Sequence, residues 1–465
     1  MMSSNNISCL KYIFLILFTA NFYTALNANP AEYAKKSIWH SKDLQFYVVI
    51  KDNIYERYQY TRISCFRGSA GFLPSIGYFD EQYFDNNFKL ELRKEGYHLT
   101  RPQDAIAIPV EQIKRLPSHC RGEPVNTVLN NFYIFWHTLN ELYSFSHISQ
   151  SQWIDKLKEM LNDIVLIDIE VMEDRTSEDI LLLDKLQSLI DVVNDAHLFL
   201  VANKLRKVIR ANDESFVFPS DYETISGKNA FIKKQASSLD NEVFSLANDR
   251  IHFARHSNQV YIGFTSFDSL HPSGRYTEES AEVMRNAANK LGDLIKTSDN
   301  VIIDLRVNEG GSVNYANLFA SLFSTEEITT SSFLVKTNDS SPREIPLSML
   351  KGNGIKVNSI TVLISRLTAS AAEYMTLNLQ SQNAITVGDR SRGAFSPVTL
   401  KALPNGWIFG LPAFQIKDHN QQWVPERIGI RADQVVDWSY EKSFQLLELK
   451  EVDAKIFNLL PDESQ

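Results

Sequence analysis

The stretch that decides the fold is SITVLISRLTASAAE, residues 359–373. Its first half, Ser359–Ser365, is a run of β-branched and apolar residues, which is typical of a buried strand. Thr368–Glu373 then combines small residues with a serine and a glutamate in the spacing that opens a helix. A strand, a turn and a helix in this order place Ser370 at the carboxyl end of a strand. Free backbone N–H groups and the helix dipole favour a developing negative charge there.

Ser370 admits two interpretations at this point. Ser370 and Glu373 fit a helix capping box, in which the serine serves only to begin the helix. A serine held at such a turn is also suited to act as a nucleophile, provided that a base lies nearby.

A second unit of the same kind lies upstream, where a predicted strand, Asn300–Leu305, runs into DLRVNEGGS, Asp304–Ser312. Its glycine pair lets the backbone turn tightly and leaves N–H groups unobstructed, so that these groups could stabilise an oxyanion. A plain glycine turn is the alternative. Asp304 and Arg306 are expected to be structural and to fix the end of the strand.

Strands and helices alternate from about residue 258 onward. Gln259–Phe267 reads as a strand, Glu278–Lys296 as a helix, and a further helix is expected near Asn314–Phe323. This alternation predicts an α/β core with a covered, mainly parallel sheet.

The residues before the core differ from it in pattern. Residues 29–122 carry short runs of β-branched and aromatic residues, such as Leu44–Ile50 and Tyr55–Cys65, and predict a β-rich accessory domain. In residues 123–225, apolar residues recur at three- and four-residue steps and predict a helical domain. His197 sits on the last of its helices or just past the end. It is the candidate base, and a packed core histidine is the alternative.

The first 28 residues have the layout of a secretory leader. Lys11 precedes an apolar run, Tyr12–Ala20, and small residues follow. This run is about half of the roughly 20 residues that a membrane-spanning helix needs, so we expect cleavage rather than anchoring. Loss of Lys11, the only charge there, changes the net charge from −9 to −9 − 1 = −10. In an oxidising compartment, Cys65 and Cys120 could pair in one disulfide or remain two buried thiols.

Length and composition are those of a soluble globular protein. A chain of 465 residues suggests about three domains. The apolar content of 44% and the charged content of 22% are ordinary. A net charge of −9 without a basic stripe argues against nucleic acid as the main partner.

Six segments together resemble the S41 peptidases, the family of tail-specific and tricorn-like proteases, over roughly residues 128–440. In chain order they are DAHLFL, VYIGFTSF, VIIDLRVNEGGS, TVLISRLTASAAEY, ITVGDRSRGAF and WVPERIGIRADQVV. The resemblance implies a crotonase/ClpP-like α/β catalytic core over residues 226–465. It also implies serine peptidase chemistry without a metal or an organic cofactor.

The resemblance also assigns roles to single residues. Ser370 matches the nucleophile, and its own N–H group, with that of Gly310 or Gly311, would form the oxyanion hole. One branch of the family pairs this serine with a lysine, but the matching position here is Ala394, so that dyad is absent.

The tricorn-like branch uses histidine and glutamate instead of lysine. His197 matches its histidine and Glu426 its glutamate, which would orient His197 or hydrogen-bond near the site. A surface glutamate is the alternative for Glu426. The second serine of that branch would precede His197, where this chain has Ala196.

The sequence therefore predicts an exported peptidase, periplasmic or secreted, that hydrolyses peptide bonds with a serine nucleophile. Its expected partner is a peptide or protein substrate. Neither nucleic acid nor stable membrane insertion after cleavage of the leader is expected. Two alternatives remain open: a non-catalytic ligand- or peptide-binding protein on the same fold, and an esterase.

Overall fold

The computed structural model describes residues 36–51, 54–68, 89–93, 96–100, 106–144, 150–169, 175–211, 220–270, 276–335 and 343–435. The leader predicted for residues 1–28 lies outside these ranges. No helix within them is long and apolar enough to cross a membrane.

The N-terminal part is an antiparallel sheet, which confirms the prediction of a β-rich region. Its strands are β1 (Ser37–Ser41), β2 (Phe46–Lys51), β3 (Ile54–Tyr60), β4 (Cys65–Arg67), β5 (Lys89–Arg93), β6 (Gly96–Thr100) and β7 (Ile108–Ile113). Their order in the sheet is β4-β3-β2-β1-β7-β6-β5. Cys65 and Cys120 form a disulfide with a Cα–Cα distance of 4.6 Å. Of the two states left open for these cysteines, the structure has the bridge.

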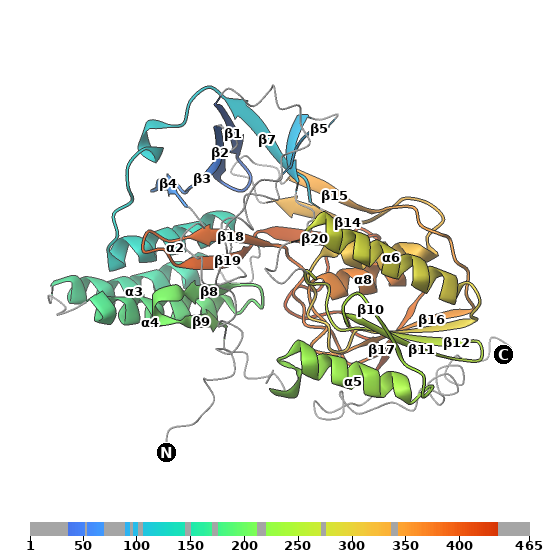
Figure 1. The fold of residues 1–465 in the computed structure, drawn as a ribbon. Helices are drawn as coiled ribbons and strands as arrows, with labels where there is room; N and C mark the ends of the chain where they lie inside the picture. The colour runs from blue at the N-terminus through green and yellow to red at the C-terminus, as the bar shows by residue number, and fades with distance from the viewer. Residues whose placement is uncertain are drawn as a thin grey trace, which may run out of the picture.

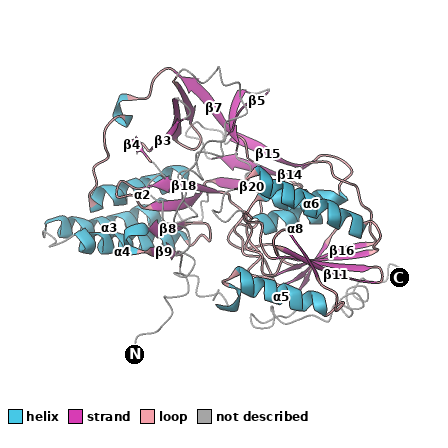
Figure 2. Ribbon diagram, in the orientation of Figure 1, coloured by secondary structure: helices cyan, strands magenta, loops and turns pink. Residues whose placement is uncertain are grey.

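Three helices follow the sheet: α2 (Val128–Leu142), α3 (Gln150–Ile169) and α4 (Arg175–Val193). They form a bundle apart from the other helices (Figure 2). The residues of α2 that recur at three- and four-residue steps are buried, with Phe132, Phe135 and Leu139 at 2% exposure or less. The periodicity thus predicted the face that packs.

Two short strands follow the bundle, β8 (Phe199–Ala202) and β9 (Lys207–Arg210). They join β18 (Val398–Ala402) and β19 (Ile408–Pro412) in a four-stranded sheet of order β18-β19-β8-β9. This sheet connects the part of the chain that carries His197 to the C-terminal part.

The α/β core is built on a seven-stranded sheet. Its strands are β10 (Phe244–Leu246), β11 (Ile251–His256), β12 (Gln259–Phe264), β13 (Asn300–Asp304), β16 (Ser359–Ile364), β17 (Ile385–Gly388) and β21 (Gln434–Val435). They lie in the order β10-β11-β12-β13-β16-β17-β21, and the pairs from β12 to β21 are parallel. A mainly parallel sheet was predicted, and it brings the carboxyl ends of β12, β13 and β16 to one edge.

Helices cover both faces of this sheet. They are α5 (Ile225–Ser237), α6 (Glu278–Ile295), α7 (Val313–Ala320) and α8 (Ala371–Gln380). Figure 1 shows α6 and α8 on one face and α5 on the other.

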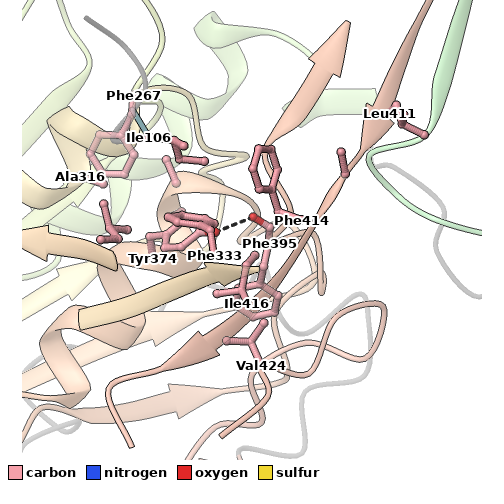
Figure 3. Packing of buried hydrophobic residues seen from close by; sticks show 14 of the residues in the cluster. Ile106, Phe267, Ala316, Phe333, Tyr374, Phe395, Leu411, Phe414, Ile416 and Val424 are labelled. Carbon is pink, nitrogen blue, oxygen red and sulfur yellow. Dashed lines mark hydrogen bonds between the residues drawn. The ribbon is translucent and has the colours of Figure 1, made fainter. Parts of the chain in front are cut away.

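A three-stranded sheet packs against α8. It has the order β15-β14-β20 and comprises β14 (Ile328–Val335), β15 (Arg343–Met349) and β20 (Phe414–Asp418). Phe333 of β14 and Phe414 of β20 pack near Tyr374 of α8, whose hydroxyl donates to the carbonyl oxygen of Phe395 over 2.8 Å (Figure 3). This apolar cluster fixes α8, and α8 begins directly after Ser370.

Candidate active site

Ser370 stands at the sharp turn between β16 and α8. Its φ of 55° and ψ of −122° are unusual for a residue with a side chain, and such strain is typical of turns that present a nucleophile. Two hydroxyls fasten this turn to the end of the neighbouring strand β13. Ser365 Oγ donates to the Arg306 carbonyl over 2.5 Å, and Thr368 Oγ1 donates to the Leu305 carbonyl over 2.9 Å.

Glu373 holds the other side of the same turn. Its buried carboxylate accepts hydrogen bonds from the Ser370 N–H (3.0 Å), Ser391 Oγ (2.5 Å), the Gly393 N–H (2.7 Å) and the Ala394 N–H (2.9 Å). Burial raises the pKa of Glu373 to about 7, although all four donors favour the charged form. The capping box of Ser370 and Glu373 that the sequence allowed is therefore present, and Ser370 is half-buried at the turn.

The glycine turn after β13 lies against Ser370, as the sequence predicted. Gly310 and Gly311 have φ of 102° and 125°, which L-residues with side chains rarely adopt. A Cβ atom added at Gly310 would lie only 2.6 Å from Ser370 Cβ and 2.8 Å from the Ala371 nitrogen. Only a glycine permits this approach.

The backbone N–H groups at this junction do not all point to a common site. The Ser370 N–H donates to Glu373, and the Gly310 N–H donates to Asn308 Oδ1 over 2.8 Å. Within the described part of the chain, no hydrogen bond engages the N–H groups of Gly311 and Ala371. The expected oxyanion donors, Ser370 with Gly310 or Gly311, stay a prediction, and in this structure the N–H groups of Ser370 and Gly310 have partners of their own.

His197 lies in the turn between α4 and β8, two residues before β8 begins. Its ring Nδ1 is 2.6 Å from the carbonyl oxygen of Ser396. A carbonyl can only accept, so Nδ1 carries the hydrogen and Nε2 is left as the basic nitrogen. Burial lowers the pKa of His197 to about 4, and the positive charges of Arg210 and Arg392 add to this effect. The ring is therefore neutral at neutral pH.

The segment Gly393–Ser396 connects the two halves of the site. Its first two N–H groups bind Glu373, which holds Ser370, and its last carbonyl binds His197. No hydrogen bond between Ser370 Oγ and the His197 ring is present among the described residues. Catalytic hydrogen bonds are often open in the absence of substrate.

Glu426 binds the same segment. Its carboxylate accepts from the N–H groups of Phe395 (3.0 Å) and Ser396 (3.1 Å). Burial raises the pKa of Glu426 strongly, and the nearby carboxylates of Asp195 and Glu373 add to this effect. Glu426 is thus a half-buried glutamate that accepts from the N–H of Ser396, the residue whose carbonyl accepts from His197, and its catalytic role stays a prediction.

Two residues that sequence reasoning missed hold the histidine turn. Asp195 Oδ1 accepts from the His197 N–H over 2.8 Å, and Asp195 Oδ2 accepts from the Tyr143 hydroxyl over 3.0 Å. An aspartate two residues before the histidine is a signal for such a turn, because its side chain bonds the backbone two residues on. The sequence contains no comparable signal for Tyr143, which is 52 residues away.

One group of possible metal ligands occurs in the described ranges, and it is remote from this site. It comprises Cys65, His119 and Cys120, and its two cysteines form the disulfide. The absence of a metal at the site remains a prediction.

Residues 258–436 match the model of peptidase family S41. This region of the chain is therefore a peptidase family S41 region. It is therefore a serine peptidase, a hydrolase whose substrates are peptides or proteins. The match includes Ser370, the glycine pair and Glu426, and it begins after His197 and α5.

Several solved structures resemble this chain. A candidate peptidase from Parabacteroides merdae is 22% identical with a TM-score of 0.54, and the match covers 73% of this chain and 99% of that chain. At this identity the likeness concerns the fold. A lipoprotein from Streptococcus agalactiae is 14% identical with a TM-score of 0.44, and the match covers 75% of this chain and 99% of that chain. The photosystem II D1 C-terminal processing protease is 15% identical with a TM-score of 0.40, and the match covers 70% of this chain and 98% of that chain. No curated protein matches the chain.

Proposed function

We propose that this S41 peptidase hydrolyses peptide bonds with Ser370 as nucleophile and His197 as general base. The observation that carries the proposal is the shared support of the two residues. Glu373 and the glycine turn hold Ser370, and Ser396, on the same short segment, holds His197 with its Nε2 as the basic nitrogen.

The chemistry follows from these positions. Neutral His197 takes the hydroxyl proton as Ser370 Oγ attacks the carbonyl carbon of the peptide bond. The N–H groups of Gly311 and Ala371 stabilise the tetrahedral oxyanion, a contribution of about 3 kcal/mol for each donor. Imidazolium His197 then gives its proton to the leaving amine, and the C–N bond breaks. Water attacks the resulting ester with His197 again as base, which releases the acid and restores Ser370.

The carboxylates act as positioning groups in this scheme. Glu426 fixes the Ser396 carbonyl, which keeps the hydrogen of His197 on Nδ1 throughout. Asp195 and Tyr143 fix the backbone of the histidine turn, where the family's supporting serine is replaced by Ala196. No proton transfer through these groups is required.

Two broader parts of the proposal rest on other features. The crotonase/ClpP-like description of the core is supported by parallel strands whose carboxyl ends run into the glycine turn and the nucleophile turn. Export to the periplasm or the medium is supported by the leader-like first 28 residues and by the Cys65–Cys120 disulfide.

A fluorophosphonate probe, which labels activated serines, tests the assignment. We expect labelling of the full chain at Ser370, with labelling lost in Ser370→Ala and His197→Ala. Ser381→Ala is the matched control, since Ser381 lies at the opposite end of α8 and should label as the wild type does. Labelling that survives His197→Ala would exclude the proposed base.

Labelling and turnover of the wild type also test the two alternatives, a non-catalytic binding protein and an esterase. A non-catalytic binding protein would show neither labelling nor turnover. An esterase would turn over short acyl esters but not peptides, whereas the proposed peptidase cleaves both.

A further inference from the structure

Helix α5 contacts the glycine-turn segment at two places, although α5 lies outside the matched region. Near its end, Gln235 Oε1 accepts from Arg306 Nη2 over 2.9 Å. Near its start, Lys228 Nζ donates to Glu309 Oε2. Arg306 and Glu309 are three residues apart, so α5 holds both ends of the stretch that leads into Gly310.

The contact of Lys228 is a nearly buried ion pair. The Lys228 side chain is 7% exposed and the Glu309 side chain 42% exposed. An ammonium group out of water is costly unless a carboxylate or hydrogen bonds compensate it. In the described ranges, Lys228 forms its ion pair with Glu309. The buried ammonium therefore holds the Glu309 carboxylate in one place.

The segment that follows β12 holds the same turn. The Phe267 N–H donates to the Gly310 carbonyl over 2.7 Å, and the Ser312 N–H donates to the Phe267 carbonyl over 2.9 Å. The N–H of Gly311, one of the two proposed oxyanion donors, lies between these bonds. Glycine permits many backbone orientations, so the aim of this N–H depends on what restrains its neighbours.

We propose that Lys228 is a positioning residue for peptide hydrolysis: by holding Glu309, it fixes the Gly310–Gly311 peptide so that the Gly311 N–H faces the oxyanion of the tetrahedral intermediate. Lys228 acts through Glu309 and does not touch the substrate. The inference rests on the proposed function and extends it to a helix that precedes the matched family region.

Replacing Lys228 by methionine tests this inference, because methionine keeps the length of the side chain without the charge. An oxyanion donor matters chiefly in the transition state, so we expect kcat for a peptide substrate to fall about tenfold with KM unchanged. Lys228→Arg should restore most of the activity. Glu309→Gln should lower kcat as well, and the double variant should be no worse than Lys228→Met.

Lys233→Met is the matched control. Lys233 lies on the same helix and pairs with Asp249 at 3.4 Å, with both side chains about half exposed. This variant should keep the wild-type kcat. A second readout is inhibition by a peptide aldehyde, which forms a tetrahedral adduct with the serine. In Lys228→Met, the affinity for the aldehyde should fall by the same factor as kcat. The affinity for the unreactive product peptide should stay constant.

The outcomes separate this inference from the proposed function. If Ser370 of the wild type is labelled by the fluorophosphonate but Lys228→Met behaves like Lys233→Met, the role of Lys228 is overturned. A purely structural role would raise KM and lower the unfolding temperature in step with kcat, which also overturns it. Should Lys228→Met fail to fold, Glu309→Gln decides, since Glu309 is partly exposed. An unlabelled wild type instead refutes the proposed function itself.

Discussion

The contribution of the His197 ring to the free energy of unfolding depends on pH. Burial lowers the pKa of the ring to about 4 in the folded chain, against a value of 6.5 for an unperturbed histidine. Between these two values, the unfolded chain binds a proton that the folded chain does not. The stabilising contribution of the neutral ring is therefore complete above pH 6.5, and it is lost as the pH falls towards 4.

His197→Gln should remove this dependence. We expect the wild type to lose stability more steeply than the variant between pH 6.5 and 4, because glutamine takes up no proton. Urea unfolding of both proteins at several pH values measures the difference. Parallel curves over this range would show that the ring is not buried as the structure has it.

The local turns at the candidate site were predictable from the sequence, whereas their hydrogen bonds were not. The ordered motifs predicted the turns at Ser370 and at the glycine pair, because these turns require small residues and glycine, and the catalytic roles of Ser370 and His197 stay predictions. The oxyanion donors could not be assigned in the same way. Their availability depends on whether Glu373 and Asn308 use the Ser370 and Gly310 N–H groups. That is a property of packed side chains rather than of the motif.

At the scale of elements, the segment Gly393–Ser396 makes hydrogen bonds to several residues of the site, which its sequence does not indicate. Every polar group of Ser396 has a partner. Its N–H donates to Glu426, its carbonyl accepts from His197, and its hydroxyl accepts from the Phe414 N–H over 3.1 Å. The orientation of His197 thus depends on the carboxylate of Glu426, which is linked to His197 by two hydrogen bonds through Ser396.

Glu426→Gln should therefore impair catalysis without removing it. A glutamine accepts with one oxygen and turns an NH₂ group towards backbone donors, so the Ser396 carbonyl shifts and His197 follows. We expect kcat/KM to fall by about 10- to 100-fold, less than in His197→Ala, because one displaced positioning group costs about 1–3 kcal/mol. Steady-state kinetics with a peptide substrate measure this fall, and Glu344→Gln on the exposed side of β15 is the control. Equal losses in Glu426→Gln and His197→Ala would instead make Glu426 indispensable to the chemistry.

Long periodic elements were predicted well, and short paired strands were not. The helix expected at Glu278–Lys296 is observed as α6, Glu278–Ile295, because its apolar spacing and its cap are local. By contrast, β8 has four residues, and its register is set by pairing with β19, where Phe199 lies opposite Gly410. Because β8 pairs with a strand about two hundred residues later in the chain, and because it is so short, its sequence contains no periodic pattern that predicts it.

At the scale of the whole molecule, the N-terminal sheet is fastened to the strand that follows the site. Gln59 of β3 imitates a backbone partner. Its Nε2 donates to the Ala402 carbonyl over 2.5 Å, and its Oε1 accepts from the Ala402 N–H over 2.8 Å. Nearby, the buried Lys401 Nζ donates to the Leu44 carbonyl over 2.6 Å. Because β18 begins two residues after Ser396, this junction lies next to the acceptor of His197.

Gln59→Leu separates the stability of this junction from catalysis. Leucine has a similar volume but leaves the N–H and the carbonyl of Ala402 without partners, and an unsatisfied buried polar group costs about 1–3 kcal/mol. We expect the free energy of unfolding to fall by about 3 kcal/mol, measured by urea denaturation, while Ser370 is still labelled at the wild-type rate under native conditions. Labelling should survive because Glu426 and Phe414 hold Ser396 independently of Gln59. The control is Gln187→Leu, whose amide bonds the Arg210 carbonyl at a more exposed position and should matter little. A proportional loss of labelling in Gln59→Leu would instead mean that the N-terminal sheet maintains the geometry of the active site.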